Sequence, residues 1–132
     1  MRRTFFLVPV IAIAVTGAAP RSVWDGVYSK DQAKRGETLY KQQCAKCHAE
    51  DLKGADGFPE LAGGDFLTKW NGRSANGLYD VMQKTMPIDD PGILSARQNA
   101  DLLAYIFSVN QFPAGEKELD REGVGDIRIE KR

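Results

Sequence analysis

The two cysteines and the single histidine of this 132-residue chain all lie in the pentapeptide CAKCH, which spans Cys44 to His48. Thiolate sulfur and imidazole nitrogen are the side-chain donors that suit soft and borderline transition metals. No second cluster of such donors exists elsewhere in the sequence. In any fold of this chain, the cysteine and histidine donors therefore lie together in one short segment.

The N-terminus has the pattern of a secretory signal peptide. Two basic residues at 2–3 precede an apolar run, Phe5 to Val15, and small residues follow it. We expect cleavage near Ala18, so that residues 1–18 are removed and the mature chain lies in the periplasm. Eleven apolar residues are too few for a bilayer core, which takes about 20. An uncleaved membrane anchor is the alternative, and we expect no stable membrane insertion after cleavage.

Four kinds of site can explain CAKCH. A structural zinc site requires four ligands, and the pentapeptide has three. A thioredoxin-like redox pair requires a βαβ context, which this sequence does not predict. A disulfide between Cys44 and Cys47 is ordinary in an exported protein, but it gives His48 no role. Covalent attachment of c-type haem has Cys-x-x-Cys-His as its signature, and we predict this site, with the disulfide as the alternative.

The composition is that of one soluble globular domain. The 18 basic and 18 acidic residues balance, and 42% of the residues are hydrophobic and 27% charged. A balanced charge gives no strong attraction to nucleic acid, so we expect no nucleic-acid partner. The length accommodates one domain rather than two.

Capping residues and apolar spacing predict three or four helices. The expected helices cover residues 30–44, 66–70, 75–85 and 96–109, and their expected caps are Ser29, Asp65, Ser74 and Ser95. Gly36 lies inside the first of them and costs about 1 kcal/mol relative to alanine, which favours a close crossing by another helix. The third helix should end before Met86-Pro87, because proline disfavours the α conformation in the residue before it.

The remaining segments predict loops rather than sheet. Residues 52–64 are rich in glycine and proline, and residues 114–132 form a charged tail that we expect to lie on the surface or to fray. We therefore expect an all-α domain over residues 19–113 followed by that tail. So small a helical domain buries only a modest core, which favours a bulky apolar group at its centre.

The chain resembles a monohaem class I c-type cytochrome from Gln32 to Val109. Four stretches carry the resemblance in the family's order, namely GETLYKQQCAKCH, PELAG (59–63), TMP (85–87) and DLLAYI (101–106). The resemblance implies a cytochrome c fold of three to four helices with long loops wrapped around one covalent haem and its iron. It also implies that Cys44 and Cys47 attach the haem and that His48 binds the iron.

Further site residues follow from the same resemblance. It implies that the Pro59 carbonyl accepts a hydrogen bond from His48 and that Leu61 presses on the porphyrin. Trp70 corresponds to an aromatic residue near a haem propionate, with an ordinary core tryptophan as the alternative. Met86 corresponds to the sixth ligand of the iron. Its position after a helix and before proline favours the same role, with Met82 or an open site as alternatives.

Histidine and methionine together would fill both axial positions and leave outer-sphere electron transfer as the chemistry. We therefore expect an electron carrier rather than a catalyst, acting between a dehydrogenase donor and an oxidase or cytochrome acceptor. The chain is also similar to small cytochromes found with quinoprotein dehydrogenases and sulfur-oxidising oxidoreductases. A haem subunit bound permanently to such a dehydrogenase is one alternative. A peroxidase or sensor with an open sixth site is another.

Overall fold

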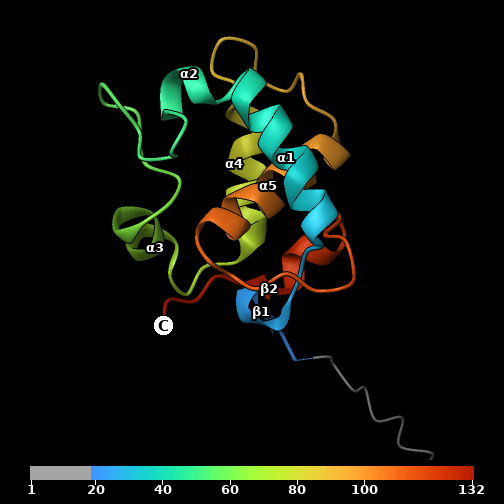
Figure 1. Cartoon of the computed structure of the whole chain (residues 1–132). Coiled ribbons are helices and arrows are strands. Elements are labelled where there is room, and N and C mark those ends of the chain that lie inside the picture. The colour runs from blue at the N-terminus through green and yellow to red at the C-terminus, as the bar shows by residue number, and fades with distance from the viewer. Residues whose placement is uncertain (1–18) are drawn as a thin grey trace, which may run out of the picture.

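The computed structural model describes residues 19–132, so the predicted signal peptide lies outside the described residues. The described residues are mostly helical, as predicted, and Figure 1 shows their arrangement. The α-helices are α1 (Lys30–Gln43), α2 (Ala45–His48), α3 (Gly64–Trp70), α4 (Ala75–Thr85) and α5 (Ala96–Val109). Two 3-10 helices, η1 (Val23–Asp25) and η2 (Gly123–Asp126), and two strands, β1 (Arg21–Ser22) and β2 (Ile127–Arg128), complete the fold. Within residues 19–132, no helix is long and apolar enough to cross a membrane.

Serine caps begin three of the helices where the sequence predicted them. Ser29 accepts from the backbone N–H of Gln32, and Ser74 accepts from that of Asn76. Ser95 and Gln98 form both halves of a capping box, which satisfies two backbone donors at the start of α5. The ends of α4 at Thr85 and of α5 before Asn110 also confirm the prediction.

The cap predicted for α3 is wrong. Gly63 occupies the cap position, and Asp65 lies inside the first turn. The Glu60 carboxylate instead accepts from the backbone N–H groups of Asp65 (2.6 Å) and Phe66 (3.1 Å). A carboxylate further back in the loop thus satisfies the donors that helix ends leave unpaired.

Helices α1 and α5 cross at Gly36, as the sequence predicted. A Cβ atom at this position would collide with the backbone carbonyl of Asp101 and lie 2.9 Å from Cβ of Tyr105. Next to this contact, the rings of Tyr40 and Tyr105 pack with their centroids 5.4 Å apart. The crossing fixes the direction of α1, and α1 leads directly into Cys44 and the haem motif.

The two ends of the described chain pack together at the opposite end of the molecule from α2 (Figure 1). Strand β1 pairs with β2 in parallel, with Arg21 opposite Ile127. The Trp24 indole N–H donates to the carbonyl of Glu130 at 2.8 Å. We call segments 21–28 and 112–130 the terminal clasp.

The expectation that residues 114–132 lie on the surface or fray is wrong. Leu119, Val124, Ile127 and Ile129 are buried, and the last two alternate with outward-facing charged residues as in a half-buried strand. The side-chain amide of Gln32 donates to the carbonyl of Leu119 at 2.7 Å and accepts from its N–H at 2.8 Å. The tail is therefore part of the hydrophobic core.

Candidate haem site

A cavity opens between the CAKCH turn with its following loop on one side and α4 with its following loop on the other. Its empty volume, open mouth included, is about 1270 Å³. Leu78, Leu94, Leu102 and Ile106 contribute apolar side chains to its inner wall. All the site residues that the sequence suggested border this one cavity, namely Cys44, Cys47, His48, Pro59, Leu61, Trp70 and Met86.

The CAKCH turn presents two free thiols to the cavity. Cys44 separates α1 from α2, and its carbonyl accepts from the N–H of His48 at 3.0 Å. Cys44 and Cys47 are half-buried and form no disulfide with each other. Burial, and then the neighbouring Cys47, raises the pKa of the Cys44 thiol to about 11, so this sulfur is protonated at neutral pH. The structure therefore does not support the disulfide alternative.

The ring of His48 is held in one orientation. The side chain is only 7% exposed, and its Nδ1 lies 2.9 Å from the carbonyl oxygen of Pro59. A carbonyl oxygen can only accept, so Nδ1 must carry the hydrogen of this bond. In the neutral imidazole, the lone pair is then on the second nitrogen, Nε2, and this is the form of histidine that binds metals.

The loop that carries Pro59 is fixed by backbone and side-chain hydrogen bonds. The carbonyl of Leu52 accepts from the N–H groups of Leu61 (2.8 Å) and Ala62 (3.3 Å). The side chain of Asn110, at the end of α5, donates to the carbonyl of Leu61 at 3.0 Å. No pattern in the sequence identifies Asn110, because its partners in this loop lie almost fifty positions earlier.

Both candidate methionines border the opposite side of the cavity. Met82 is buried on α4, at 8% exposure, where it packs in the core. Met86 is the first residue after α4 and has extended backbone angles, φ −118° and ψ 148°. The chain therefore leaves the helix at Met86 and continues along the cavity as a strap towards Asp89.

Trp70 forms a cationic corner of the cavity. Its side chain is 7% exposed, and the guanidinium of Arg73 and the ammonium of Lys69 lie 5.4 Å and 5.8 Å from the ring centroid. Such distances permit cation–π attraction. The hydroxyl of Tyr79 donates to the carbonyl of Ala96 at 3.0 Å, so it is not free for a carboxylate at this corner.

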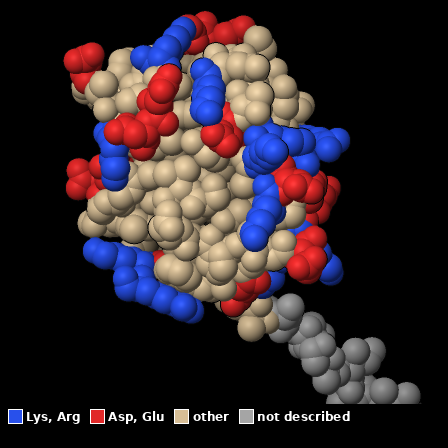
Figure 2. All heavy atoms as spheres, in the orientation of Figure 1, with Lys and Arg blue, Asp and Glu red and all other residues tan. Residues whose placement is uncertain are grey.

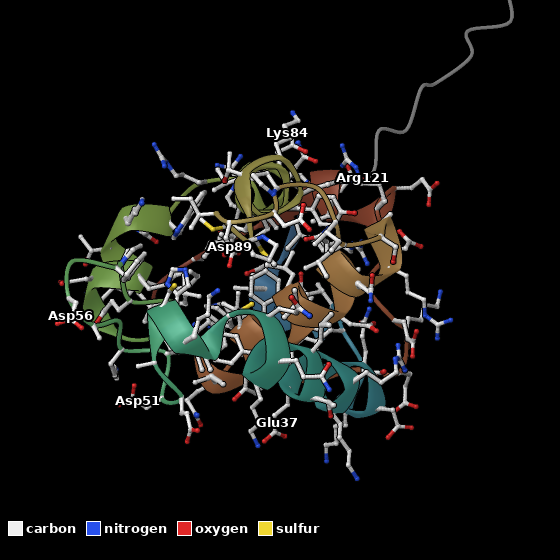
Figure 3. The ribbon with its side chains drawn as sticks, turned by 90° about the horizontal axis from the view of Figure 1, so that it is seen from above. Glu37, Asp51, Asp56, Lys84, Asp89 and Arg121 are labelled. Carbon is white, nitrogen blue, oxygen red and sulfur yellow. The ribbon has the colours of Figure 1, made fainter. Side chains whose placement is uncertain are left out.

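The mouth of the cavity combines apolar side chains with one ion pair. Phe58, Val81 and Ile88 border it and are 40%, 45% and 66% exposed. Lys46 of the CAKCH turn pairs with Asp89 of the strap after Met86, so this pair joins the two sides of the cavity. Seen from above, Asp89 lies over the centre of the molecule, whereas other labelled charges such as Asp51 and Asp56 lie at its edge (Figure 3).

The donor set fits haem c better than a bare metal ion. Within residues 19–132, no three His, Cys, Asp or Glu side chains come together as a metal site. A porphyrin brings its own equatorial nitrogens and needs from the protein an apolar space, axial donors and, in haem c, two thiols. The cavity offers each of these: an apolar wall, the thiols of Cys44 and Cys47, the Nε2 of His48 and a methionine sulfur.

The family described as cytochrome C oxidase, cbb3-type, subunit III has a model that matches residues 31–106. The chain belongs to this family. It is therefore a monohaem c-type cytochrome of an electron-transfer family, it binds haem c covalently, and its fold is the cytochrome c fold, as the sequence predicted. Four of its α-helices are the predicted ones, and the short α2 is a fifth.

Two curated relatives of this cytochrome carry the name Cbb3-type cytochrome c oxidase subunit CcoP. The relative from Azospirillum brasilense is 30% identical over 74% of this chain and 39% of its own length. The relative from Azospirillum sp. (strain B510) is 31% identical over 57% of this chain and 30% of its own length. The chain thus spans less than half the length of these relatives.

A solved structure also shares the fold of this cytochrome. The crystal structure of the sulfane dehydrogenase SoxCD from Paracoccus pantotrophus matches with a TM-score of 0.59. The match covers 80% of this chain and 61% of that chain, at 22% sequence identity. At this identity the likeness establishes a common fold and nothing about partners.

Proposed function

We propose that this cytochrome carries single electrons between a periplasmic dehydrogenase and a respiratory acceptor, with His48 and Met86 as the axial ligands of its haem. The observation that carries the proposal is the state of His48. Its Nδ1 is occupied by the Pro59 carbonyl, so its Nε2 is the nitrogen left for the cavity. When bound, haem supplies an iron that takes up and releases one electron.

Cys44 and Cys47 attach the porphyrin in this proposal. Each thiol would supply the sulfur of one thioether link, its S–H adding across a vinyl C=C bond of the porphyrin with no atom released. The thiols flank the turn that ends in His48, and all three side chains border the same cavity. One short turn can therefore fix both the position of the porphyrin and the ring that binds its iron.

Met86 is the better candidate for the second axial position. Its extended backbone and the strap that follows place it outside the packed face of α4. Met82 has the ordinary surroundings of a core methionine, buried beside Leu78. Filling both axial positions leaves no open site for oxygen or peroxide, which favours electron transfer over a peroxidase or sensor.

Other cavity residues support the orientation of the porphyrin. Leu61 offers its side chain on the His48 side of the cavity. The cationic groups of Arg73 and Lys69 lie over the ring of Trp70, which favours a haem carboxylate at that corner. The indole N–H of Trp70 is a donor available to such a carboxylate.

Electrons are proposed to enter and leave through the mouth formed by Phe58, Val81 and Ile88. Exposed apolar side chains at this opening suit brief contact with a redox partner, since such encounters bury little surface. On the face turned to the viewer in Figure 2, both signs of charge are interspersed around an uncharged area. At the mouth itself, Lys46 and Asp89 pair with each other, which favours apolar contact over attraction by a single-sign patch.

Replacement of the proposed sixth ligand tests the proposal. Met86→Ala should abolish the weak long-wavelength band that a Met–iron bond gives in the ferric spectrum and should lower the reduction potential. Met82→Ala is the matched control and should keep the band. Loss of the band in the Met82 variant with retention in the Met86 variant would reverse the assignment. A wild-type protein without the band would favour an open sixth site.

The proposed export has a separate test. Intact mass of the purified wild-type protein should correspond to a chain that begins at Ala19 and carries one haem. A mass that includes residues 1–18 together with recovery in the membrane fraction would favour the uncleaved anchor instead.

A further inference from the structure

We propose that Asn110 is a positioning residue that sets the strength of the His48–Pro59 hydrogen bond and thereby the reduction potential of the haem. The inference rests on the proposed ligation by His48. Asn110 is 7% exposed and is not among the residues that border the cavity. Any influence on the haem must therefore pass through the groups that its side chain holds.

The amide of Asn110 makes three hydrogen bonds. Its Nδ2 donates to the carbonyls of Leu61 (3.0 Å) and Ile106 (2.9 Å), and its Oδ1 accepts from the N–H of Gly63 (3.1 Å). The side chain thus ties the end of α5 to two points of the loop that begins at Pro59. Gly63 has a φ of 116°, a backbone conformation that favours glycine, so this end of the loop has a defined shape.

These bonds connect His48 to both of the crossing helices, α1 and α5. From the crossing at Gly36, α1 leads to the haem motif, and His48 bonds to Pro59. Leu61 lies two residues after Pro59, and its carbonyl accepts a hydrogen bond from Asn110 at the end of α5. Helix α5 in turn crosses α1 at Gly36. The donor and the acceptor of the His48–Pro59 bond are therefore positioned from the two crossing helices. Without Asn110, the acceptor side loses its attachment to α5.

A weaker His48–Pro59 bond has a predictable electronic effect. The hydrogen bond from Nδ1 raises the basicity of a metal-bound histidine. A more basic ligand favours the more highly charged oxidised iron, so the bond lowers the reduction potential. Loosening the loop should therefore raise the potential without any change in the ligands themselves.

The test compares two buried amides replaced by leucine in the full haem-loaded protein. Asn110→Leu removes two bonds to the Pro59 loop and one to Ile106 of α5, and Gln32→Leu removes two bonds to Leu119 in the terminal clasp. Both variants should be less stable in urea. Only Asn110→Leu should raise the midpoint potential in a potentiometric titration. In NMR of the reduced protein, its His48 Nδ1–H should exchange with solvent about tenfold faster.

The readouts separate a positioning role from a structural one. An Asn110→Leu protein that is destabilised but keeps the wild-type potential and exchange rate would overturn the inference. A Gln32→Leu protein whose midpoint potential shifts as much as that of Asn110→Leu would overturn it as well. If Asn110→Leu does not accumulate with haem, Asn110→Ser is measured in the same way and must show the same direction. A wild-type protein whose spectrum indicates another proximal ligand than His48 would instead overturn the proposed function.

Discussion

The cavity and the terminal clasp satisfy their buried groups in different ways. In the clasp, protein groups pair with one another: both amide atoms of Gln32 bond to Leu119, and the Tyr28 hydroxyl donates to the carbonyl of Phe112 at 2.6 Å. At the cavity, the thiols of Cys44 and Cys47 and the Nε2 of His48 border an opening lined by apolar side chains. The clasp is complete as a protein core, whereas the cavity is completed by haem.

The difference indicates how the two ends of the molecule contribute to stability. We expect contacts within the clasp to form whether or not haem is attached, because they join only residues of this chain. Contacts across the cavity form mainly against the porphyrin. Changes in the clasp should therefore act on the haem-loaded and haem-free chains alike, and changes in the cavity should act mainly on the loaded chain.

The largest effect is expected from removal of the second half of the clasp. A chain that stops after Pro113 loses four buried side chains, those of Leu119, Val124, Ile127 and Ile129. At roughly 1.5–3 kcal/mol each, the loss of about 6–12 kcal/mol is comparable with the whole stability of a small domain, about 5–15 kcal/mol. We expect such a chain not to fold, as judged by circular dichroism and thermal melting.

A shorter truncation is the control for this experiment. A chain that stops after Glu130 keeps the bond from Trp24 to the Glu130 carbonyl and the buried isoleucines. It should melt within a few degrees of the full chain. A chain ending at Pro113 that melts like the full chain would show that the clasp is an appendage rather than part of the core.

A pair of point variants sharpens the comparison. Ile129 is fully buried in the clasp, and Ile129→Ala should cost about 2–5 kcal/mol of unfolding free energy. Leu61 borders the cavity and is half-buried, and Leu61→Ala should cost about 1–2 kcal/mol in the loaded protein. In a Cys44→Ala/Cys47→Ala background, which cannot attach haem, the cost at Ile129 should persist and the cost at Leu61 should fall below about 0.5 kcal/mol.

Urea unfolding of the variants in both backgrounds measures these costs. An equal cost at Leu61 in the two backgrounds would mean that Leu61 packs on protein rather than on porphyrin. A haem-free background without a cooperative unfolding transition would show that the clasp does not hold the chain together by itself, which contradicts the comparison.

Sequence patterns predicted the cavity better than the clasp, and the reason is physical. The haem motif is local, since Cys44, Cys47 and His48 fall within one turn, and serine caps act on N–H groups two or three residues away. Leu119 of the clasp bonds to Gln32 of α1, 87 positions earlier, and β1 and β2 have only two residues each. Such pairings leave no period in the sequence.

Two further misses have the same origin. The apolar residues of the C-terminal segment are separated by charged ones, so their pattern resembles that of a solvated tail. Ile127 and Ile129 nevertheless alternate with charged residues as in a half-buried strand. Asp65 was expected to cap α3 because it directly precedes the apolar residues, but Glu60 reaches the same donors from the loop. Asn110 was expected only to end α5. Its side-chain partners depend on the tertiary fold.

The smallest expected effect is a pH dependence at the edge of the clasp, where Glu118 lies. The guanidinium of Arg35 joins α5 to the clasp through Asp101 (2.9 Å) and Glu118 (2.9 Å). The hydrogen bond from Arg35 holds the pKa of the Glu118 carboxyl below its usual value in the folded state. The pair therefore stabilises the fold fully above the unfolded pKa of glutamate, about 4.3, and the contribution is lost as pH falls through the lower folded pKa.

Glu118→Gln should reduce the unfolding free energy at pH 7 by less than about 1 kcal/mol, because the pair is largely exposed. The difference from wild type should disappear in acid, where Glu118 is protonated and no longer carries the charge that pairs with Arg35. Glu116→Gln is the control, since Glu116 forms no ion pair within residues 19–132, and it should leave the pH profile unchanged. The midpoint potential should be that of wild type in both variants, because the clasp lies at the end of the molecule away from the haem motif. A Glu118→Gln protein with an altered potential would show that the two ends are coupled through α5.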